Sequence, residues 1–336
     1  MYLGVIPEYV LANATYLSET FPDHNIVLIT DSKEQASRVD SLGFTTWVCS
    51  DVRKSWNIVS NFSAHKVGFR NDFWFKTVAR FYALYEYQSL APNTPLLHVE
   101  ADVWLSPAFP MHLLEEIKGK IAYPLKNLTE GIASTLYVSN LGTLRALIDY
   151  AEKCFQLNPL STDVSILGSF HTAFPYLFEN LPTLPLKFDI LRDPAVQELS
   201  ESLNRNFEKY CGIFDSSSLG IHYTGVDPRN NWGFRGLFDT PGAPMELKKV
   251  KFVIRDGVPF LKYAGSLTEI FSLHVHSKDI RMFSTKTYVR RIQKISSYDQ
   301  GRKRNEFIGL DSLFIFTKTF TIRILLLARQ VYRDLR

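Results

Sequence analysis

The sequence predicts a mixed α/β protein in which helices flank a Rossmann-like, mostly parallel sheet. Three short apolar segments, residues 2–6, 25–30 and 44–49, alternate with two segments of helical spacing, residues 7–17 and 33–42. Strands that alternate with helices pair in parallel, because each helix carries the chain back to the start of the next strand. Hydrophobic residues make up 46% and aromatic residues 14% of the 336 residues. That content is enough for a packed core and excludes a disordered chain.

The cysteines and the N-terminal residues favour a cytoplasmic protein. Cys49, Cys154 and Cys211 are odd in number and far apart, which argues for reduced thiols and against a disulfide framework. None of them belongs to a Cys-X-X-Cys motif, so a zinc site is not expected. The first residues form neither a basic segment nor a long apolar one, so we expect no signal peptide.

The two N-terminal helices begin with recognisable residues. Pro7 suits a first helical turn, where its missing N–H costs nothing, and Ser32 can cap the helix that follows. Ligands of parallel α/β sheets bind beyond the carboxyl ends of the strands. Thr30 and Asp31 lie at such an end and are therefore candidate nucleotide-binding residues. A plain turn and helix cap is the alternative interpretation.

Residues 72–87 predict a long amphipathic helix. Phe73, Thr77, Arg80 and Leu84 recur at helical spacing and share one face. Arg80 on that face has two interpretations. On the residues alone, its stem packs while its charged end stays in water. The second interpretation comes from the resemblance given below.

The stretch from Pro95 to Pro107 is an apolar run that predicts a buried strand and contains Glu100 and Asp102. Residues two apart on a strand point to the same face, so we expect the two carboxylates to project into one small volume. Like charges repel there, and burying them is costly unless a positive charge lies between them. Hard oxygen ligands suit Mg²⁺ or Mn²⁺. The alternative is a strand end with two solvated acids.

The following residues continue the alternation of strands and helices. We expect helices over 111–117 and 140–157, strands over 120–124 and 132–138, a hairpin over 247–264 and a strand over 270–276. Another helix begins near Ser161 and Thr162, either of which can cap it. Asp163 in its first turn has two open interpretations: a favourable contact with the helix dipole or, as the resemblance given below implies, a place on the acceptor side of an active site.

A second polar stretch, residues 213–230, contains His222-Tyr-Thr-Gly225 and a turn that includes Arg229. Imidazole is a common ligand of transition metals, and glycine allows a backbone to approach a phosphate closely. Arg229 could neutralise phosphate charge.

His274 and His276 share a face of the last expected strand. No acid or cysteine is near them in the sequence, so we expect them to be structural.

These features resemble the glycosyltransferases of the GT-A fold. Glu100-Ala-Asp102 is similar to their Asp-X-Asp metal motif, with Glu in place of the first Asp. The residues from Thr77 to Leu84 resemble their Thr-X-X-Arg-Phe-X-X-Leu helix, whose Arg approaches the nucleotide or the metal-binding acids. The resemblance assigns that role to Arg80.

The His-X-X-Gly sequence resembles that of the glycogenin-like members, in which the His is a third metal ligand. The resemblance covers about residues 1–235 and implies a metal held by Glu100, Asp102 and His222, with Gly225 near the diphosphate. It further implies transfer from a nucleotide sugar, with UDP the expected nucleotide, to a glycan or lipid-linked acceptor. In such an enzyme Asp102 would serve catalysis through the metal. Asp163 would be the candidate base if the reaction inverts the sugar.

The C-terminal residues are basic. Residues 277–336 hold 14 Lys and Arg against 5 Asp and Glu, a net charge of +9, while the remainder carries −5. We expect residues 1–275 to form the catalytic domain and residues 276–336 to form a basic, partly helical extension. Its apolar helix, near 313–335, suits the inner face of an anionic membrane, although a packing helix with a solvated stripe is the alternative.

Two other classes of function fit parts of the sequence. A metal-dependent nucleotidyltransferase or phosphatase also places acids at strand ends, but residues 1–12 contain no Gly-X-Gly phosphate loop. A non-catalytic module that binds glycans or membranes would tolerate the loss of the acids. No nucleic-acid partner is expected.

Overall fold

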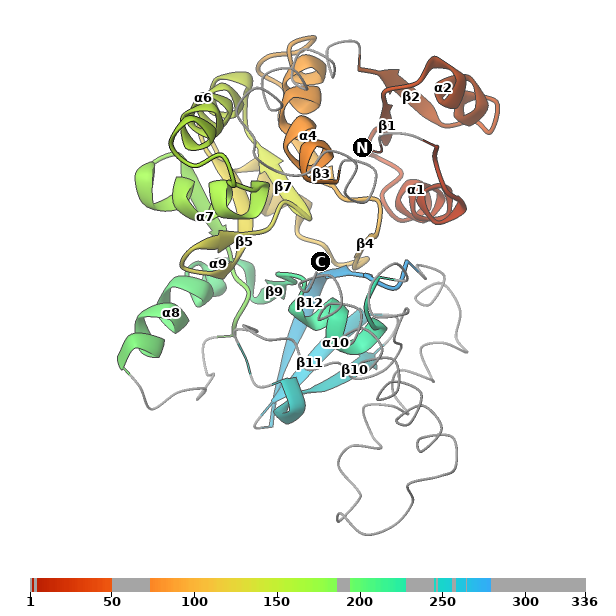
Figure 1. The fold of residues 1–336 in the computed structure, drawn as a ribbon. Helices are drawn as coiled ribbons and strands as arrows, with labels where there is room; N and C mark the ends of the chain where they lie inside the picture. Colours follow the sequence, from red (N-terminus) through yellow and green to blue (C-terminus); the bar gives the residue numbers. More distant parts are fainter. Residues whose placement is uncertain are drawn as a thin grey trace, which may run out of the picture. The chain divides into compact units, whose positions relative to one another are not determined.

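The computed structural model describes residues 2, 5–49, 73–185, 194–227, 245, 247–255, 258–263 and 265–278. The chain divides into two compact units, Met1–Ser296 and Ser297–Arg336, and every described residue belongs to the first. That unit is a mixed α/β fold with several sheets (Figure 1), which confirms the predicted fold class at this level. Arg229 and the expected C-terminal helix lie outside the described residues.

The N-terminal elements follow the predicted alternation. They are α1 (Glu8–Thr20), β1 (Val27–Thr30), α2 (Lys33–Asp40) and β2 (Thr45–Val48). β1 and β2 pair in parallel, and the Ser32 hydroxyl accepts a hydrogen bond of 3.3 Å from the amide of Gln35, as its predicted capping role requires. The strand expected over 2–6 is not found, because Tyr2, Val5 and Ile6 belong to no strand.

A central five-stranded sheet follows. Its strands are β3 (Leu96–Val99), β7 (Thr135–Val138), β5 (Ile121–Asn127), β6 (Glu130–Gly131) and β8 (Phe178–Leu181). Along β5, Ile121 and Tyr123 pack with α4 (Phe73–Gln88), α6 (Leu141–Leu157) and α7 (Asp163–Ala173), which lie side by side in Figure 1. Ala122 points to the other face and packs in a second apolar cluster with residues of α1 and of α5 (Met111–Glu115).

The C-terminal sheet contains β10 (Lys251–Arg255), β11 (Val258–Tyr263), β12 (Ser266–His274) and β4 (Val103–Leu105) in that order, with β9 (Gly212–Phe214) beside β12. The antiparallel pairing of β10 with β11 confirms the predicted hairpin. The remaining elements are α8 (Pro194–Asn204), α9 (Phe207–Tyr210), α10 (Ser218–Thr224) and the 3-10 helix η2 (Leu247–Lys249).

Two expectations about the sheets are wrong. Among the described residues, strand pairs are mostly antiparallel, with three parallel pairs, β1–β2, β5–β8 and β9–β12. Hairpins form the antiparallel pairs β10–β11 and β11–β12, which need no crossover helix. The antiparallel pairs β3–β7 and β4–β12 join strands that are far apart in the sequence. The run from 95 to 107 is also not one strand, because β3 and β4 belong to different sheets.

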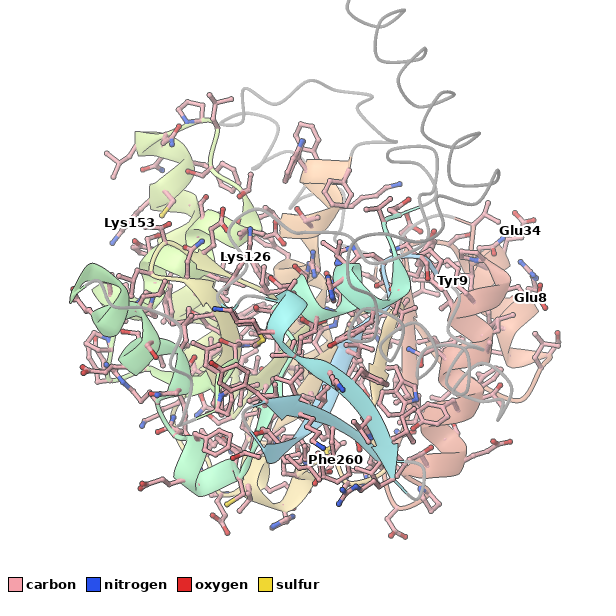
Figure 2. All side chains as sticks on the ribbon, turned by 90° about the horizontal axis from the view of Figure 1, so that it is seen from below. Glu8, Tyr9, Glu34, Lys126, Lys153 and Phe260 are labelled. Atoms are coloured by element: carbon pink, nitrogen blue, oxygen red, sulfur yellow. The ribbon has the colours of Figure 1, made fainter. Side chains whose placement is uncertain are left out.

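Charged side chains of the helices α1, α2 and α6 face the solvent. Glu8, Glu34 and Lys153 are exposed, and Figure 2 shows them at the periphery of the packed side chains. Within the residues that the structure describes, no helix combines the length and the apolar character needed to cross a bilayer.

Candidate metal centre

Glu100 and Asp102 lie in a turn between two sheets. The amide of Glu100 donates to the carbonyl of Ser134 at 2.9 Å, which ends β3, and the amide of Val103 donates back to the carbonyl of Glu100 at 2.9 Å. The sequence-based reason for the proximity of the two acids, alternation along one strand, is therefore wrong. The turn brings their carboxylates together instead, beside a third residue.

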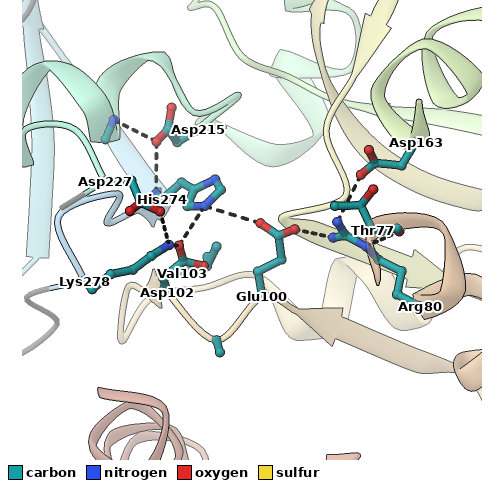
Figure 3. Close-up of polar contacts among 12 residues, drawn as sticks. Thr77, Arg80, Glu100, Asp102, Val103, Asp163, Asp215, Asp227, His274 and Lys278 are labelled. Carbon is teal, nitrogen blue, oxygen red and sulfur yellow. Dashed lines mark hydrogen bonds and ion pairs between the residues drawn. The ribbon is translucent and has the colours of Figure 1, made fainter. Parts of the chain in front are cut away.

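That third residue is His274, the last residue of β12. β12 pairs with β4 so that His274 lies opposite Val103, next to Asp102 in the chain. Its Nε2 atom is 3.1 Å from Oδ2 of Asp102 and 3.3 Å from Oε2 of Glu100 (Figure 3). The reason given for expecting a structural His274, that no acid is near it, is wrong. Strand pairing across 172 residues supplies two acids.

Arg80 holds the opposite side of Glu100. One Nη atom of the buried guanidinium donates to Oε1 of Glu100, and the other donates to Oδ2 of Asp163 at 3.0 Å. The Nε atom donates to the carbonyl of Thr77 at 2.6 Å, one turn earlier in α4. Of the two interpretations of Arg80, the structure supports contact with the acids, and its charged end does not remain in water.

Asp163 is therefore explained by an ion pair rather than by the helix dipole alone. Thr162 and Ser165 form a reciprocal capping box at the start of α7, so the cap does not need the Asp163 side chain. The carboxylate is buried, and burial raises its pKa even though Arg80 lies beside it.

Lys278 adds a positive charge to the other side of Asp102. Its ammonium group donates to Oδ2 of Asp102 and lies 3.8 Å from Oδ2 of Asp227 (Figure 3). Both acids are buried. The centre thus joins Arg80, Glu100, His274, Asp102, Lys278 and Asp227 in a continuous line of alternating charges.

Asp215 fixes the position of the His274 backbone. Its buried carboxylate accepts hydrogen bonds from the amides of His274 at 3.0 Å, Gly220 at 2.8 Å and Leu219 at 3.0 Å. This ties α10 to the end of β12. Gly220 permits the close approach, because a Cβ atom at that position would lie 1.9 Å from the carbonyl oxygen of His274.

The remaining predicted site residues are not members of this cluster. His222 is buried in α10, where its ring contacts Tyr223 edge-on, and it is not one of the grouped ligand-bearing residues. Gly225 ends α10 with a φ of 90°, a backbone conformation that explains a glycine without any phosphate. Thr30 is buried and Asp31 is exposed at the end of β1.

The electrostatics favour the charged forms of these side chains. Burial opposes ionisation of Asp102, but His274 and Lys278 outweigh it and hold its pKa well below the ordinary value. Burial similarly opposes ionisation of Glu100, and Arg80 and His274 lower its pKa. Burial disfavours the imidazolium of His274, yet the charges of Asp102 and Glu100 raise its pKa.

The donor set fits a divalent cation. Among the described residues, the group placed to hold a metal is Glu100, Asp102 and His274, whose ligand atoms all lie within 4.8 Å of one another. Two hard carboxylate oxygens and one imidazole nitrogen suit Mn²⁺ in particular, since imidazole is a ligand for transition metals and carboxylates suit Mn²⁺ and Mg²⁺ alike.

Comparisons with family models, with curated proteins and with solved structures found no match to this chain. Its functional assignment therefore depends on the residues of the centre and on their geometry.

Proposed function

We propose that this chain is a metal-dependent glycosyltransferase of the GT-A type that uses a nucleotide sugar, with UDP as the expected nucleotide. The observation that carries the proposal is the convergence of Glu100, Asp102 and His274 at the end of a strand in an α/β unit. Two carboxylates and a histidine with open coordination positions are suited to holding Mn²⁺ or Mg²⁺ against a diphosphate.

Each residue of the centre would have its own role in the reaction. A divalent cation held by Glu100, Asp102 and His274 would act as a Lewis acid that neutralises charge on the departing diphosphate. Arg80 keeps Glu100 ionised and fixes its orientation, because the planar guanidinium contacts both Glu100 and Asp163. The ammonium of Lys278, half-buried beside Asp102, is a second positive group at the same place.

The acceptor is assigned only by class. A glycan or lipid-linked acceptor agrees with the resemblance, and the net charge of +9 on residues 277–336 would bring the protein to an anionic membrane surface. Vesicle sedimentation tests this part: binding to vesicles with anionic lipid, lost when residues 297–336 are deleted, supports it. Equal binding to neutral vesicles contradicts it.

Calorimetric titration with UDP tests the central proposal. We expect the protein to bind UDP in the presence of Mn²⁺ and to lose at least about tenfold in affinity when EDTA replaces the metal. Asp102→Asn, which keeps the side-chain shape, should cause a similar loss. The matched control is Asp149→Asn, which alters an exposed acid paired within α6 to Arg145.

Hydrolysis of UDP-sugars by the same preparations then identifies the donor. Metal-dependent release of UDP from one sugar donor supports transfer chemistry. The proposal is contradicted if the affinity for UDP is unchanged both by EDTA and by Asp102→Asn.

A further inference from the structure

A cavity of about 510 Å³ lies beside the metal centre, between the N-terminal strands and the central sheet. It is lined by residues of α1, β1, α4 and β3, which are labelled in Figure 1, and one end reaches Glu100 and Ala101. We call it the β1–β3 cavity. Its walls include members of the apolar clusters on both faces of the central sheet, such as Leu84 on one face and Leu17 on the other. It therefore lies in the layer of the strands rather than in a layer of helices.

Strand β1 turns a free edge to this cavity. In a strand, the N–H and C=O of one residue point to one side, and those of the next residue point to the other. The carbonyl of Thr30 accepts from Cys49 on the β2 side, so the backbone groups of Val27 and Ile29 face the opposite side. On that side, the bond formed among the described residues is from the amide of Tyr2 to the carbonyl of Ile29, at 2.8 Å.

Strand β3 turns a second free edge to the cavity. The amide of Glu100 bonds to Ser134, so by the same alternation His98 and Leu96 also face β7. The backbone groups of Leu97 and Val99 then face away from β7, and they form no backbone hydrogen bond on that side with any residue that the structure describes. Both strands also line the cavity with their side chains. The cavity is thus bordered by two strand edges.

Buried polar atoms at the same cavity lack partners. Oδ1 of Asn13, Oε1 of Gln88, Nε2 of His98 and Oη of Tyr137 have no hydrogen-bond partner among the described residues, and the four side chains are at most 5% exposed. Burying such atoms unsatisfied is costly, and a native interior rarely gathers several of them around one space. This second observation shows that polar groups around the space are left without partners by the described residues.

The position of Tyr2 beside β1 indicates what kind of molecule the cavity can accommodate. The chain passes from the bond between Tyr2 and Ile29 to Ile6, whose amide donates to the Gln35 side chain at 3.1 Å, in the helix that follows β1. It therefore runs in the same direction as β1 and leaves beyond the carboxyl end of that strand. A segment leading into Tyr2 from its N-terminal side would lie alongside Val27, within the cavity, parallel to β1.

We propose that the β1–β3 cavity binds one further β-strand, an extended segment of about four mostly apolar residues that leads into Tyr2 from its N-terminal side. Such a strand pairs with β1 on one edge and with β3 on the other. It joins the two-stranded and five-stranded sheets into one sheet in the order β2, β1, new strand, β3, β7, β5, β8. A strand covered on both faces is continuously apolar and often β-branched, and its peptide groups supply the hydrogen bonds that both edges lack.

An N-terminal extension of the full chain tests the proposal. One version carries Thr-Val-Ile-Val-Ile-Val before Met1, and the matched control carries Gly-Ser-Gly-Ser-Gly-Ser. We expect the apolar extension alone to raise the melting temperature by about 4 °C or more. It should also slow amide hydrogen exchange, measured by mass spectrometry, in peptides that cover 27–30 and 96–99, because those amides gain partners.

Two variants establish where the strand binds. Leu97→Pro removes an N–H that faces the cavity and not β7, and Ala14→Phe places a larger side chain at a residue that lines the cavity. Each should abolish the gain in protection given by the apolar extension. Equal protection from both extensions overturns the proposal. So does a gain that persists in folded Ala14→Phe protein, or tight binding of a small apolar dye that the extension fails to displace.

Discussion

Strand β3 borders two very different environments. At its carboxyl end the chain enters the candidate metal centre, where each charged side chain has an oppositely charged partner, from Arg80 through Asp102 to Lys278. Along its free edge lies the β1–β3 cavity, where Gln88, His98 and Tyr137 each bury a polar atom without a partner. Both environments contain buried polar atoms, and they adjoin at Glu100.

The difference shows what burial requires of a polar group. In the centre, the free energy lost in desolvating each charge is offset by ion pairs and hydrogen bonds of the chain itself. At the cavity, no described group does this. We therefore expect substitutions in the centre to be severe because they leave a charge unpaired, and substitutions at the cavity to be mild or even stabilising.

The largest effect is expected for Arg80→Met. It leaves Glu100 and Asp163 buried without their shared cation, so we expect the free energy of unfolding to fall by about 3 to 5 kcal/mol, measured by urea denaturation. Arg145→Met is the control, because its partner Asp149 is about half exposed and the change should cost less than about 1 kcal/mol. An equal loss of unfolding free energy in the two variants would contradict a buried ion pair between Arg80 and the two acids.

The next largest effect is expected on Mn²⁺ binding, and it distinguishes His274 from His222 as the histidine ligand. His274→Ala should weaken Mn²⁺ binding by at least about tenfold, because it removes a ligand, whereas His222→Ala should leave the affinity within about threefold. Calorimetry on folded protein, verified by circular dichroism, measures both. The reverse result would restore the ligand set predicted from the sequence.

The comparison of the two histidines also shows which features of the fold and of the site can be predicted from the sequence. Residues that are neighbours in the chain predict the parallel pair over 25–49, the Arg80 helix, the cap at Ser32 and the hairpin, and these predictions are confirmed. Glu100 and Asp102 were identifiable because two acids interrupt an apolar run.

His274, Lys278 and Asp215 were not identifiable in the same way. They reach the centre through the pairing of β12 with β4 and through the fixing of α10 on β12, contacts that no local pattern specifies. The apolar run from 95 to 107 likewise gives no sign of its division between two sheets. Hydrophobicity predicts that a segment is buried but not which strand it pairs with.

A smaller effect, on the free energy of unfolding, tests whether the Tyr137 hydroxyl at the cavity lacks a partner. We expect changes of opposite sign at Tyr137 and Tyr123. Tyr137→Phe removes the unpartnered hydroxyl and should raise the free energy of unfolding by about 1 kcal/mol. Tyr123→Phe is the matched variant on the neighbouring strand. It removes a hydroxyl that donates to the carbonyl of Leu167 at 2.7 Å, and should lower the free energy of unfolding by about 1 kcal/mol. A loss at both tyrosines in thermal denaturation would show that the Tyr137 hydroxyl has a partner in solution.

The smallest effect concerns the cation that the chain itself supplies to the centre. The Lys278 ammonium donates to the same Asp102 oxygen that faces His274, so it competes with a divalent ion for that oxygen. Lys278→Met should therefore strengthen Mn²⁺ binding by about fivefold, which corresponds to roughly 1 kcal/mol for unit charges 4 Å apart in water. Lys153→Met, on the exposed face of α6, is the control and should change nothing. If Lys278→Met weakens the binding of Mn²⁺ without nucleotide, the ammonium supports the acids rather than competing with the metal, because its loss then disorders Asp102.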